Sequence, residues 1–276
     1  MIKIDFKNNH IDFWKAKSIS DKEKMDVYEI LKQAYDQNVL QDNNTEILSN
    51  FVEYTKDFKN NYKAQLLQDI FASFVTKNGF DKTFLEFGAT NGLSLSNTYM
   101  LEKELGWSGA LAEPDDQWID SLKKNRPNTK IITKCIWKKS NEKLNFFSSD
   151  EGVLSTLEEF KYSDSESMPS NADVRNKSGK NIVVETISLN DVIKEYFNEK
   201  CPSYLSVDTE GSEFEILNSF NFSDYRPAVL TVEHNFSKSQ DMIDELLISK
   251  NYVRIFKKLT VFDAWYVSND AFYSIL

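Results

Sequence analysis

Residues 83–97, with the sequence TFLEFGATNGLSLSN, constrain the fold of this chain more than any other stretch. Thr83–Phe87 is a short aromatic and aliphatic run that stops at Gly88, which predicts a buried strand. Serines beyond the run can cap a following helix, and Gly88 and Gly92 lie in the loop between the two. Glycine lets the backbone approach a ligand closely, and the first turn of a helix presents free N–H groups there. The stretch therefore predicts the nucleotide-binding turn of an open α/β sheet.

The charge of this loop indicates which nucleotide it would bind. No Lys or Arg occurs from Phe84 to Glu102, and the loop lacks the third glycine of a dinucleotide-binding G-x-G-x-x-G motif. Glu86 lies near the end of the strand instead, and Glu113 ends the next apolar run, about 20 residues past Gly92, where an acid takes ribose hydroxyls. S-adenosylmethionine fits, since it has a cationic end and a ribose. A solvated turn with incidental acids is the alternative interpretation.

Strand-like and helix-like segments alternate from residue 81 onward, which is typical of a parallel sheet built from βαβ units. The last two β-rich runs are separated by only a few residues, so they predict an antiparallel hairpin. We therefore expect an α/β protein with a Rossmann-like, mostly parallel, seven-stranded sheet and a C-terminal hairpin, the architecture of class I methyltransferases. The expected strands are residues 83–87, 109–113, 130–134, 144–148, 182–187, 203–208, 228–234, 252–256 and 261–267.

The first 80 residues predict a helical extension to a domain formed by residues 81–276. Apolar residues recur at helical spacing over residues 27–35, 47–58 and 62–77. Such stripes predict helices that pack on the sheet or on a second subunit, and a homodimer through these helices is the expected assembly. The last of the three helices leads into the first strand, so polar side chains at its start can reach the pocket.

Residues 150–181 are rich in Ser, Asp, Glu, Asn and Lys and show little periodicity, which predicts a long loop or lid. Arg175, Lys177 and Lys180 make the end of this segment basic. These side chains suit a substrate phosphate, although a solvated charge cluster is the simpler interpretation.

The formal charge of −10 over 276 residues disfavours a nucleic-acid partner, which needs a basic face. The two cysteines, Cys135 and Cys201, have neither metal-ligand spacing nor the density of a secreted scaffold. No apolar run is long enough to span a bilayer, and the first residues lack the apolar core of a signal peptide. We therefore expect a cytoplasmic protein with no membrane span.

Acidic residues end several of the predicted parallel strands, and such ends meet in one crevice of an open α/β sheet. Asp208 ends one strand, and Glu233 and His234 end the next. Clustered acids are costly unless a cation or a retained proton offsets them, so these three residues are the predicted ligands of Mg²⁺ or Mn²⁺. Glu233 and His234 can share an ion only if the chain turns out of the sheet there, because successive side chains face opposite ways. Without a metal, Asp208 or His234 would act as the base.

Four segments, FLEFGATNGLSLSN, GWSGALAEP, LSVDTEGSEFEIL and TVEHN, resemble in order and spacing the FkbM family of S-adenosylmethionine-dependent methyltransferases. The resemblance covers roughly residues 62–267. It implies O-methylation of a hydroxyl on a sugar, a nucleotide-activated sugar or another natural product, as in surface polysaccharide synthesis. The cofactor-binding residues that it implies are Glu86, Gly88, Asn91, Gly92 and Asn97 on the methionine side, Glu113 on the ribose, and Cys135 and Ile136 at the adenine. Asn91 departs from the expected aspartate.

Two other functions fit the same sheet. A nicotinamide-dependent oxidoreductase would have to bind a pyrophosphate, which the two-glycine loop and the acid-lined crevice oppose. A catalytically inactive binding protein with a methyltransferase fold would keep the pocket without its chemistry. Binding of S-adenosylhomocysteine compared with a reduced nicotinamide cofactor separates the three.

Overall fold

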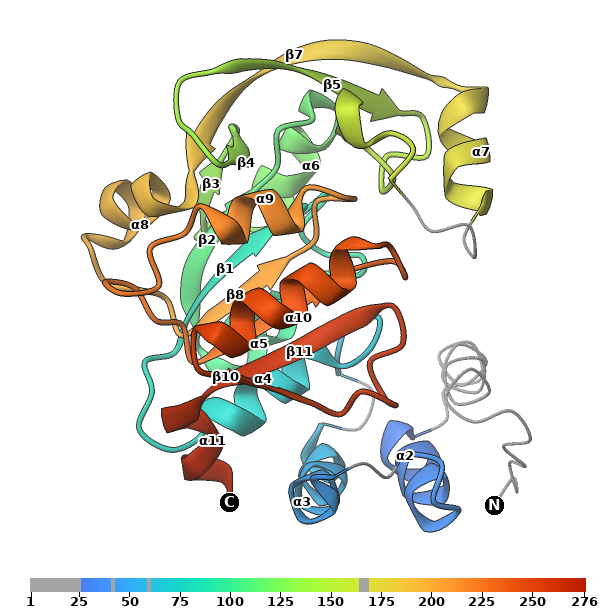
Figure 1. Ribbon diagram of the computed structural model, residues 1–276, viewed down its shortest axis with the longest axis vertical. Helices are drawn as coiled ribbons and strands as arrows, with labels where there is room; N and C mark the ends of the chain where they lie inside the picture. The colour runs from blue at the N-terminus through green and yellow to red at the C-terminus, as the bar shows by residue number, and fades with distance from the viewer. Residues whose placement is uncertain (1–25, 41–42, 59–60, 164–168) are drawn as a thin grey trace.

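The computed structural model describes residues 26–40, 43–58, 61–163 and 169–276. Its main sheet contains seven strands in the order β10 (Tyr252–Ile255), β11 (Asp263–Ser268), β9 (Val229–Glu233), β8 (Tyr204–Val207), β1 (Thr83–Phe87), β2 (Ser108–Ala112) and β3 (Lys130–Ile132) (Figure 1). β11 runs antiparallel to β9 and β10, and the pairs from β9 to β3 are parallel. The predicted class I, Rossmann-like fold with an antiparallel C-terminal hairpin is confirmed.

The two faces of this sheet bury separate apolar cores because side chains alternate along each strand. Phe84 and Tyr204 lie in one core, and their neighbours Leu85 and Leu205 lie in the other. The first core is shared with α4 (Gln68–Thr76), α5 (Tyr99–Leu105), α6 (Asp116–Asn125) and α11 (Asn269–Ile275). The second core is shared with α8 (Leu189–Phe197), α9 (Glu213–Asn218) and α10 (Ser239–Ser249). All helices among the described residues are too short or too polar to cross a membrane.

The N-terminal helices extend the first core. α2 (Val27–Asp36), α3 (Thr45–Tyr54) and the 3-10 turn η1 (Thr55–Asp57) lie at one end of the molecule (Figure 1). The ring of Phe51 in α3 lies 6.1 Å from that of Phe71 in α4 and 5.3 Å from that of Phe256 beyond β10. These helices therefore pack on the sheet layer of their own chain. The homodimer expected through them stays a prediction, and residues 1–25 of the predicted extension lie outside the described residues.

The third predicted helix is shorter than residues 62–77, since α4 begins at Gln68. Two side chains at its start hold the preceding segment in a different conformation. Asp69 Oδ2 accepts hydrogen bonds from the N–H groups of Lys63 (3.1 Å) and Ala64 (3.4 Å), and Gln68 Oε1 accepts one from Leu66 N–H (2.8 Å). These side chains thus bind the backbone N–H groups of a segment that is not helical.

A second sheet, with strand order β4 (Cys135–Trp137), β7 (Gly179–Ser188), β5 (Lys143–Ser149) and β6 (Thr156–Leu157), lies at the end of the molecule far from α2 and α3 (Figure 1). The segment 150–181, predicted as a loop, contains β6, the 3-10 turn η2 (Glu158–Phe160), α7 (Pro169–Lys177) and the start of β7. The segment is therefore not one continuous loop: β6 pairs with β5, and β7 pairs with β5 from Gly179 onward. Residues 164–168 of it lie outside the described residues.

Candidate functional site

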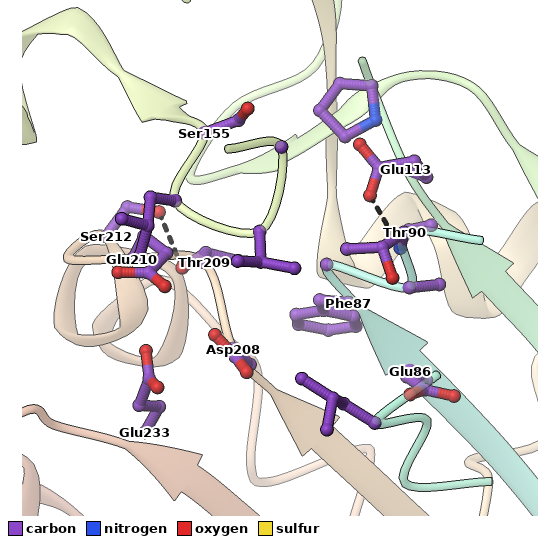
Figure 2. A pocket seen from close by; sticks show the side chains of 18 of the residues that line it. Glu86, Phe87, Thr90, Glu113, Ser155, Asp208, Thr209, Glu210, Ser212 and Glu233 are labelled. Carbon is purple, nitrogen blue, oxygen red and sulfur yellow. Dashed lines mark hydrogen bonds between the residues drawn. The ribbon is translucent and has the colours of Figure 1, made fainter. Parts of the chain in front are cut away.

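A cavity of about 270 Å³ opens at the carboxyl ends of β1, β2, β8 and β9 (Figure 2). Its wall includes the loop after β1, the ends of β2 and β4, the segment 152–155 and the loop after β8. This is the position at which open α/β sheets bind ligands. Gly88, with φ of +65°, brings the β1 loop so close to β8 that a Cβ there would lie 2.1 Å from the carbonyl oxygen of Asp208. A ligand held by the β1 loop therefore lies directly beside Asp208.

Glu86 forms one end of the cavity and is buried. Its carboxylate accepts hydrogen bonds from Ser96 Oγ (3.0 Å), Asn97 N–H (2.8 Å) and the Thr98 hydroxyl. Burial raises its pKa, and the positive charge of Arg126 opposes that shift. Asn97 donates from Nδ2 to Ser206 Oγ (2.9 Å), while its buried Oδ1 has no hydrogen-bond partner among the described residues. An unpaired buried acceptor beside a carboxylate suits an ammonium group of a ligand.

Arg126 holds this end of the site together from behind, and its side chain is fully buried. Its guanidinium forms an ion pair with Glu102 and donates to the carbonyl oxygen of Gly92 (3.2 Å), to Ser96 Oγ (3.3 Å) and to Thr98 Oγ1 (3.2 Å). One side chain from the end of α6 thus connects most of the loop that follows β1.

Glu113, after β2, forms the opposite side of the cavity. One carboxylate oxygen accepts the N–H of Thr90 (2.8 Å; Figure 2) and the other that of Asp115 (2.8 Å). Burial raises its pKa to about 7, although the two backbone hydrogen bonds lower it. A carboxylate can accept about four hydrogen bonds, so two acceptor positions remain for ligand hydroxyls. Cys135 and Ile136 line the cavity next to Glu113, and burial raises the pKa of the Cys135 thiol to about 12, which keeps it neutral.

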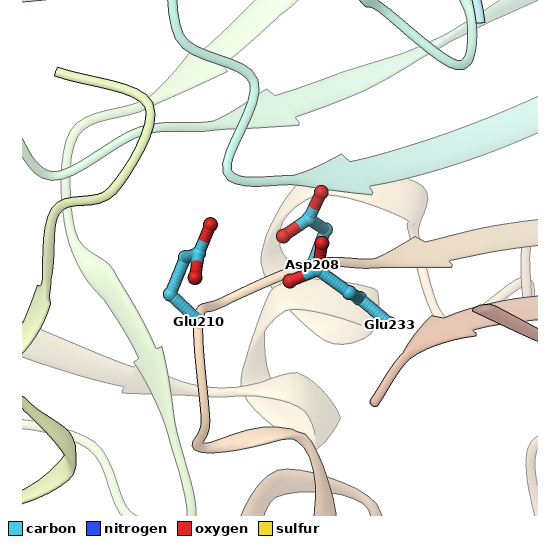
Figure 3. Close-up of side chains that lie close together, drawn as sticks. All are labelled: Asp208, Glu210 and Glu233. Carbon is cyan, nitrogen blue, oxygen red and sulfur yellow. The ribbon is translucent and has the colours of Figure 1, made fainter. Parts of the chain in front are cut away.

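Three further carboxylates, from the end of β9 and the loop after β8, lie close together in the same cavity (Figure 3). One oxygen from each of Asp208, Glu210 and Glu233 lies within 4.8 Å of the other two. Val207 pairs with Val232, so Asp208 and Glu233 are the next residues of adjacent strands and face each other. Burial raises the pKa of both carboxyl groups. The charge of Asp208 raises the pKa of Glu233 further, whereas a hydrogen bond with Glu233 opposes the rise at Asp208. Glu233 Oε2 is buried with no hydrogen-bond partner among the described residues. At neutral pH the pair must keep a proton or bind a cation.

The sequence matches the family model described as the methyltransferase FkbM domain over residues 86–254, more than half of the chain. The chain belongs to the FkbM methyltransferase family. Membership implies use of S-adenosylmethionine, and the matched residues extend from Glu86 to Arg254. No curated protein matches the sequence.

One solved structure, a precorrin-6y C5,15-methyltransferase from Geobacter metallireducens GS-15, is similar over 68% of this chain and 72% of its own chain. The two are 9% identical, with a TM-score of 0.36. At this level the likeness carries no argument about the chain. The family assignment depends on the family match alone.

Of the cofactor-binding residues expected for an FkbM methyltransferase, Glu86, Gly88, Asn97, Glu113, Cys135 and Ile136 line the cavity. Asn91 and Gly92 do not line it. Asn91 Oδ1 accepts from the N–H groups of Leu93 (2.9 Å) and Ser94 (2.8 Å), so the side chain shapes the loop. Gly92 faces α6, where a Cβ would lie 2.5 Å from Leu122 and 2.8 Å from Arg126. Both residues shape the loop after β1 from outside the cavity.

The structure places His234 apart from the acid cluster, which among the described residues consists of Asp208, Glu210 and Glu233. The chain stays in the sheet direction at Glu233, and His234 consequently faces the opposite side. Its Nδ1 accepts from Phe236 N–H (3.0 Å), and its Nε2 donates to the carbonyl oxygen of Asp263 (3.1 Å). Burial and the nearby Arg254 lower its pKa to about 4. With both ring nitrogens bonded to backbone, His234 can neither ligate a metal nor act as a base.

Several cavity residues were absent from the sequence prediction of the site, among them Glu210, Thr90 and the segment 152–155. Glu210 lies two residues beyond Asp208, and only the turn after β8 brings it back to the cluster. Gly152 was the one available signal in its segment. A Cβ there would lie 2.1 Å from the Trp118 ring, so glycine allows this segment to pack on α6. Gln65 also lines the cavity, as anticipated for the residues that lead into the first strand.

The raised pKa of Glu113 predicts a pH dependence of nucleoside binding. Ribose hydroxyls donate hydrogen bonds and favour the carboxylate, so affinity should rise as pH increases through about 7 and then level off. We expect roughly tenfold tighter binding of 5′-methylthioadenosine at about pH 8 than at about pH 6, because the ionised fraction of Glu113 grows by that factor. This compound has no group of its own that titrates in the range. Calorimetry should find weaker, pH-independent binding for Glu113→Gln, and a flat profile for the wild type would contradict the assignment.

Proposed function

We propose that this FkbM-family protein is an S-adenosylmethionine-dependent O-methyltransferase whose acceptor is a hydroxyl group of a sugar. The observation that carries this proposal is the Asp208–Glu233 pair, which lines the same cavity as Glu86 and Glu113. Methylation of a hydroxyl requires loss of its proton, and a buried acid pair with raised pKa values is suited to accept it. Sugar as the acceptor class follows from the family resemblance.

In this proposal, different residues bind the cofactor and accept the proton. Glu113 would accept the ribose hydroxyls, and Glu86 with Asn97 Oδ1 would take the ammonium group. When bound, S-adenosylmethionine supplies an electrophilic methyl group. Asp208, which adjoins Gly88 of the cofactor loop, would orient the acceptor hydroxyl and receive its proton as the O–C bond forms and the C–S bond breaks.

The acid cluster also fits a divalent cation, and we propose Asp208, Glu210 and Glu233 as its ligands in place of the set with His234. Carboxylate oxygens suit Mg²⁺ and Mn²⁺, and the unpartnered Glu233 Oε2 is available to one. A cation bound there would acidify the acceptor hydroxyl. It would also lower the pKa values of Asp208 and Glu233, since it replaces their shared proton.

Chelation tests the cation. Protein treated with a chelator and dialysed should lose methyl transfer, and added Mg²⁺ or Mn²⁺ should restore it, while S-adenosylhomocysteine binding stays the same. Glu233→Gln should lose Mn²⁺ binding measured by calorimetry, whereas Glu245→Gln, on the exposed side of α10, should keep it. Full activity after exhaustive chelation would contradict a role for the cation, and Asp208 would then act as the base without a metal.

Mass spectrometry of a sugar panel incubated with protein and S-adenosylmethionine tests the reaction itself. The expected product carries one additional methyl group on oxygen. Transfer to a nitrogen atom, to protein or to RNA would contradict the proposal. The oxidoreductase interpretation has lost its basis with the family match, and the inactive-protein interpretation predicts cofactor binding without any methylated product.

A further inference from the structure

The wall of the cavity is acidic to an unusual degree. The acidic side chains that line it are those of Glu86, Glu113, Asp208, Glu210 and Glu233. None of the described residues that line the cavity is a lysine, an arginine or a histidine. A divalent cation on Asp208, Glu210 and Glu233, together with the Arg175 guanidinium that pairs with Glu210, would leave this cluster without excess positive charge. The wall therefore offers an anionic group no net attraction.

Three backbone N–H groups at this edge, which could otherwise bind a phosphate, are bound by the protein's own carboxylates. In the loop after β8, Glu213 Oε1 accepts the N–H groups of Thr209 (2.8 Å) and Gly211 (3.0 Å). On the other side, Glu113 accepts the N–H of Thr90. Turns of this kind bind anions in many nucleotide sites. Here the internal carboxylates fill them.

Arg175, one of the basic residues that suited a substrate phosphate in the sequence, is bound by other groups of the protein. Its fully buried guanidinium donates to the carbonyl oxygens of Leu154 (2.9 Å) and Lys161 (3.3 Å) and forms an ion pair with Glu210 (2.6 Å). Glu210 thus balances the charge of Arg175, and backbone carbonyl oxygens accept hydrogen bonds from its guanidinium. The phosphate role suggested for the basic end of segment 150–181 does not extend to Arg175.

The rim of the cavity is apolar where it meets solvent. Leu95 is 48% exposed and Val153 is 46% exposed, and both line the cavity together with Phe262. Leu95 also has a φ of +61°, which a side chain of its size rarely adopts. Large exposed apolar side chains that gather around a pocket commonly mark a surface that a ligand covers.

We infer that the acceptor enters this cavity as an uncharged compound with an apolar face next to its hydroxyl, and without a phosphate or nucleotide. This inference rests on the proposed function and narrows it, because a nucleotide-activated sugar would bring two or more negative charges to an acid-lined cavity. The acceptor is then a sugar already joined to an apolar or uncharged group. A reaction that attaches the sugar to that group must precede methylation.

A matched set of sugars tests the inference. Phenyl β-glucoside, methyl β-glucoside and UDP-glucose, with the corresponding galactose compounds, are titrated into protein saturated with S-adenosylhomocysteine. We expect the phenyl glycosides to bind at least about tenfold more tightly than the nucleotide sugars, since charge repulsion at ~10 Å in a protein of effective dielectric ~20 has that effect. Turnover with S-adenosylmethionine should follow the same order in kcat/KM.

Three results would count against these ideas separately. Preferred binding or methylation of the nucleotide sugar would overturn the inference and leave the proposed function intact. Binding of neither set to the loaded protein would also overturn it, because an uncharged glycoside would then be rejected. Failure of S-adenosylhomocysteine itself to bind would contradict the proposed function.

Two serine variants test whether the apolar rim, and not any exposed valine, sets the preference for phenyl glycosides. Val153→Ser should reduce the preference for phenyl over methyl glycoside about threefold to tenfold, in line with the apolar contact removed. Val183→Ser, at a more exposed valine of β7 outside the cavity, should leave the preference unchanged. Val183→Ser should also bind S-adenosylhomocysteine as the wild type does. An unchanged preference in Val153→Ser would contradict the apolar rim.

Discussion

Asp208→Asn should lower the rate of methyl transfer about a hundredfold or more, and S-adenosylhomocysteine should still bind within a factor of about three. Asparagine keeps the shape of the side chain, but it cannot accept a proton or balance the charge of a cation. Asp208 adjoins the cofactor loop at Gly88 and faces Glu233, so its carboxylate lies where the methyl group would be transferred. The loss should therefore appear in kcat more than in cofactor affinity.

The measurement is single-turnover methylation of the best acceptor by wild-type and Asp208→Asn protein, together with calorimetry of the cofactor product. Asp241→Asn, on an exposed position of α10, is the matched control and should retain full activity. Wild-type rates in folded Asp208→Asn protein would show that this carboxylate takes no part in the chemistry.

Arg126→Met should destabilise the protein by about 3–5 kcal/mol, the usual effect of removing one partner from a buried ion pair. The substitution preserves much of the apolar packing of the side chain against the Phe84 ring, whose centroid lies 5.5 Å from the guanidinium carbon. It removes the charge that faces Glu102 and Glu86, and it leaves the carbonyl oxygen of Gly92 without its donor. Cofactor affinity should fall as well, since the loop after β1 loses its support.

Denaturant unfolding monitored by tryptophan fluorescence measures this effect. Arg126→Lys keeps the charge but not the fork of donors, so we expect an intermediate loss. The double variant Arg126→Met with Glu86→Gln should recover part of the stability, because the buried charge left behind is then removed. A loss below about 1 kcal/mol in Arg126→Met would contradict the role given to the ion pair.

Short-range patterns were sufficient for the fold. Thr83–Phe87 with Gly88 defined the central strand and its loop, and the short connection near the C-terminus defined the hairpin. The same reasoning located Glu86, Glu113, Asp208 and Glu233, because the end of a strand can be read from its neighbours. The second sheet was missed since its pairing of β5 with β7 joins residues 30 to 42 positions apart.

Side-chain direction at the ends of elements was the main source of error within the site. His234 follows Glu233 directly, and alternation along the strand turns it to the other face of the sheet. Glu210 takes its place through a turn whose conformation depends on Glu213 and Arg175, neither of which is adjacent to it in sequence. Asn91 and Gly92 sit in the motif, yet they serve the loop itself.

Calorimetric titration with S-adenosylhomocysteine and with NADH tests the central claim most directly, because it requires no knowledge of the acceptor. We expect one S-adenosylhomocysteine to bind per chain, more weakly in Glu113→Gln, and no binding of NADH, whose pyrophosphate would meet an acid-lined cavity. Binding of NADH without S-adenosylhomocysteine, or of neither compound by folded protein, would contradict the assignment of this cavity to S-adenosylmethionine.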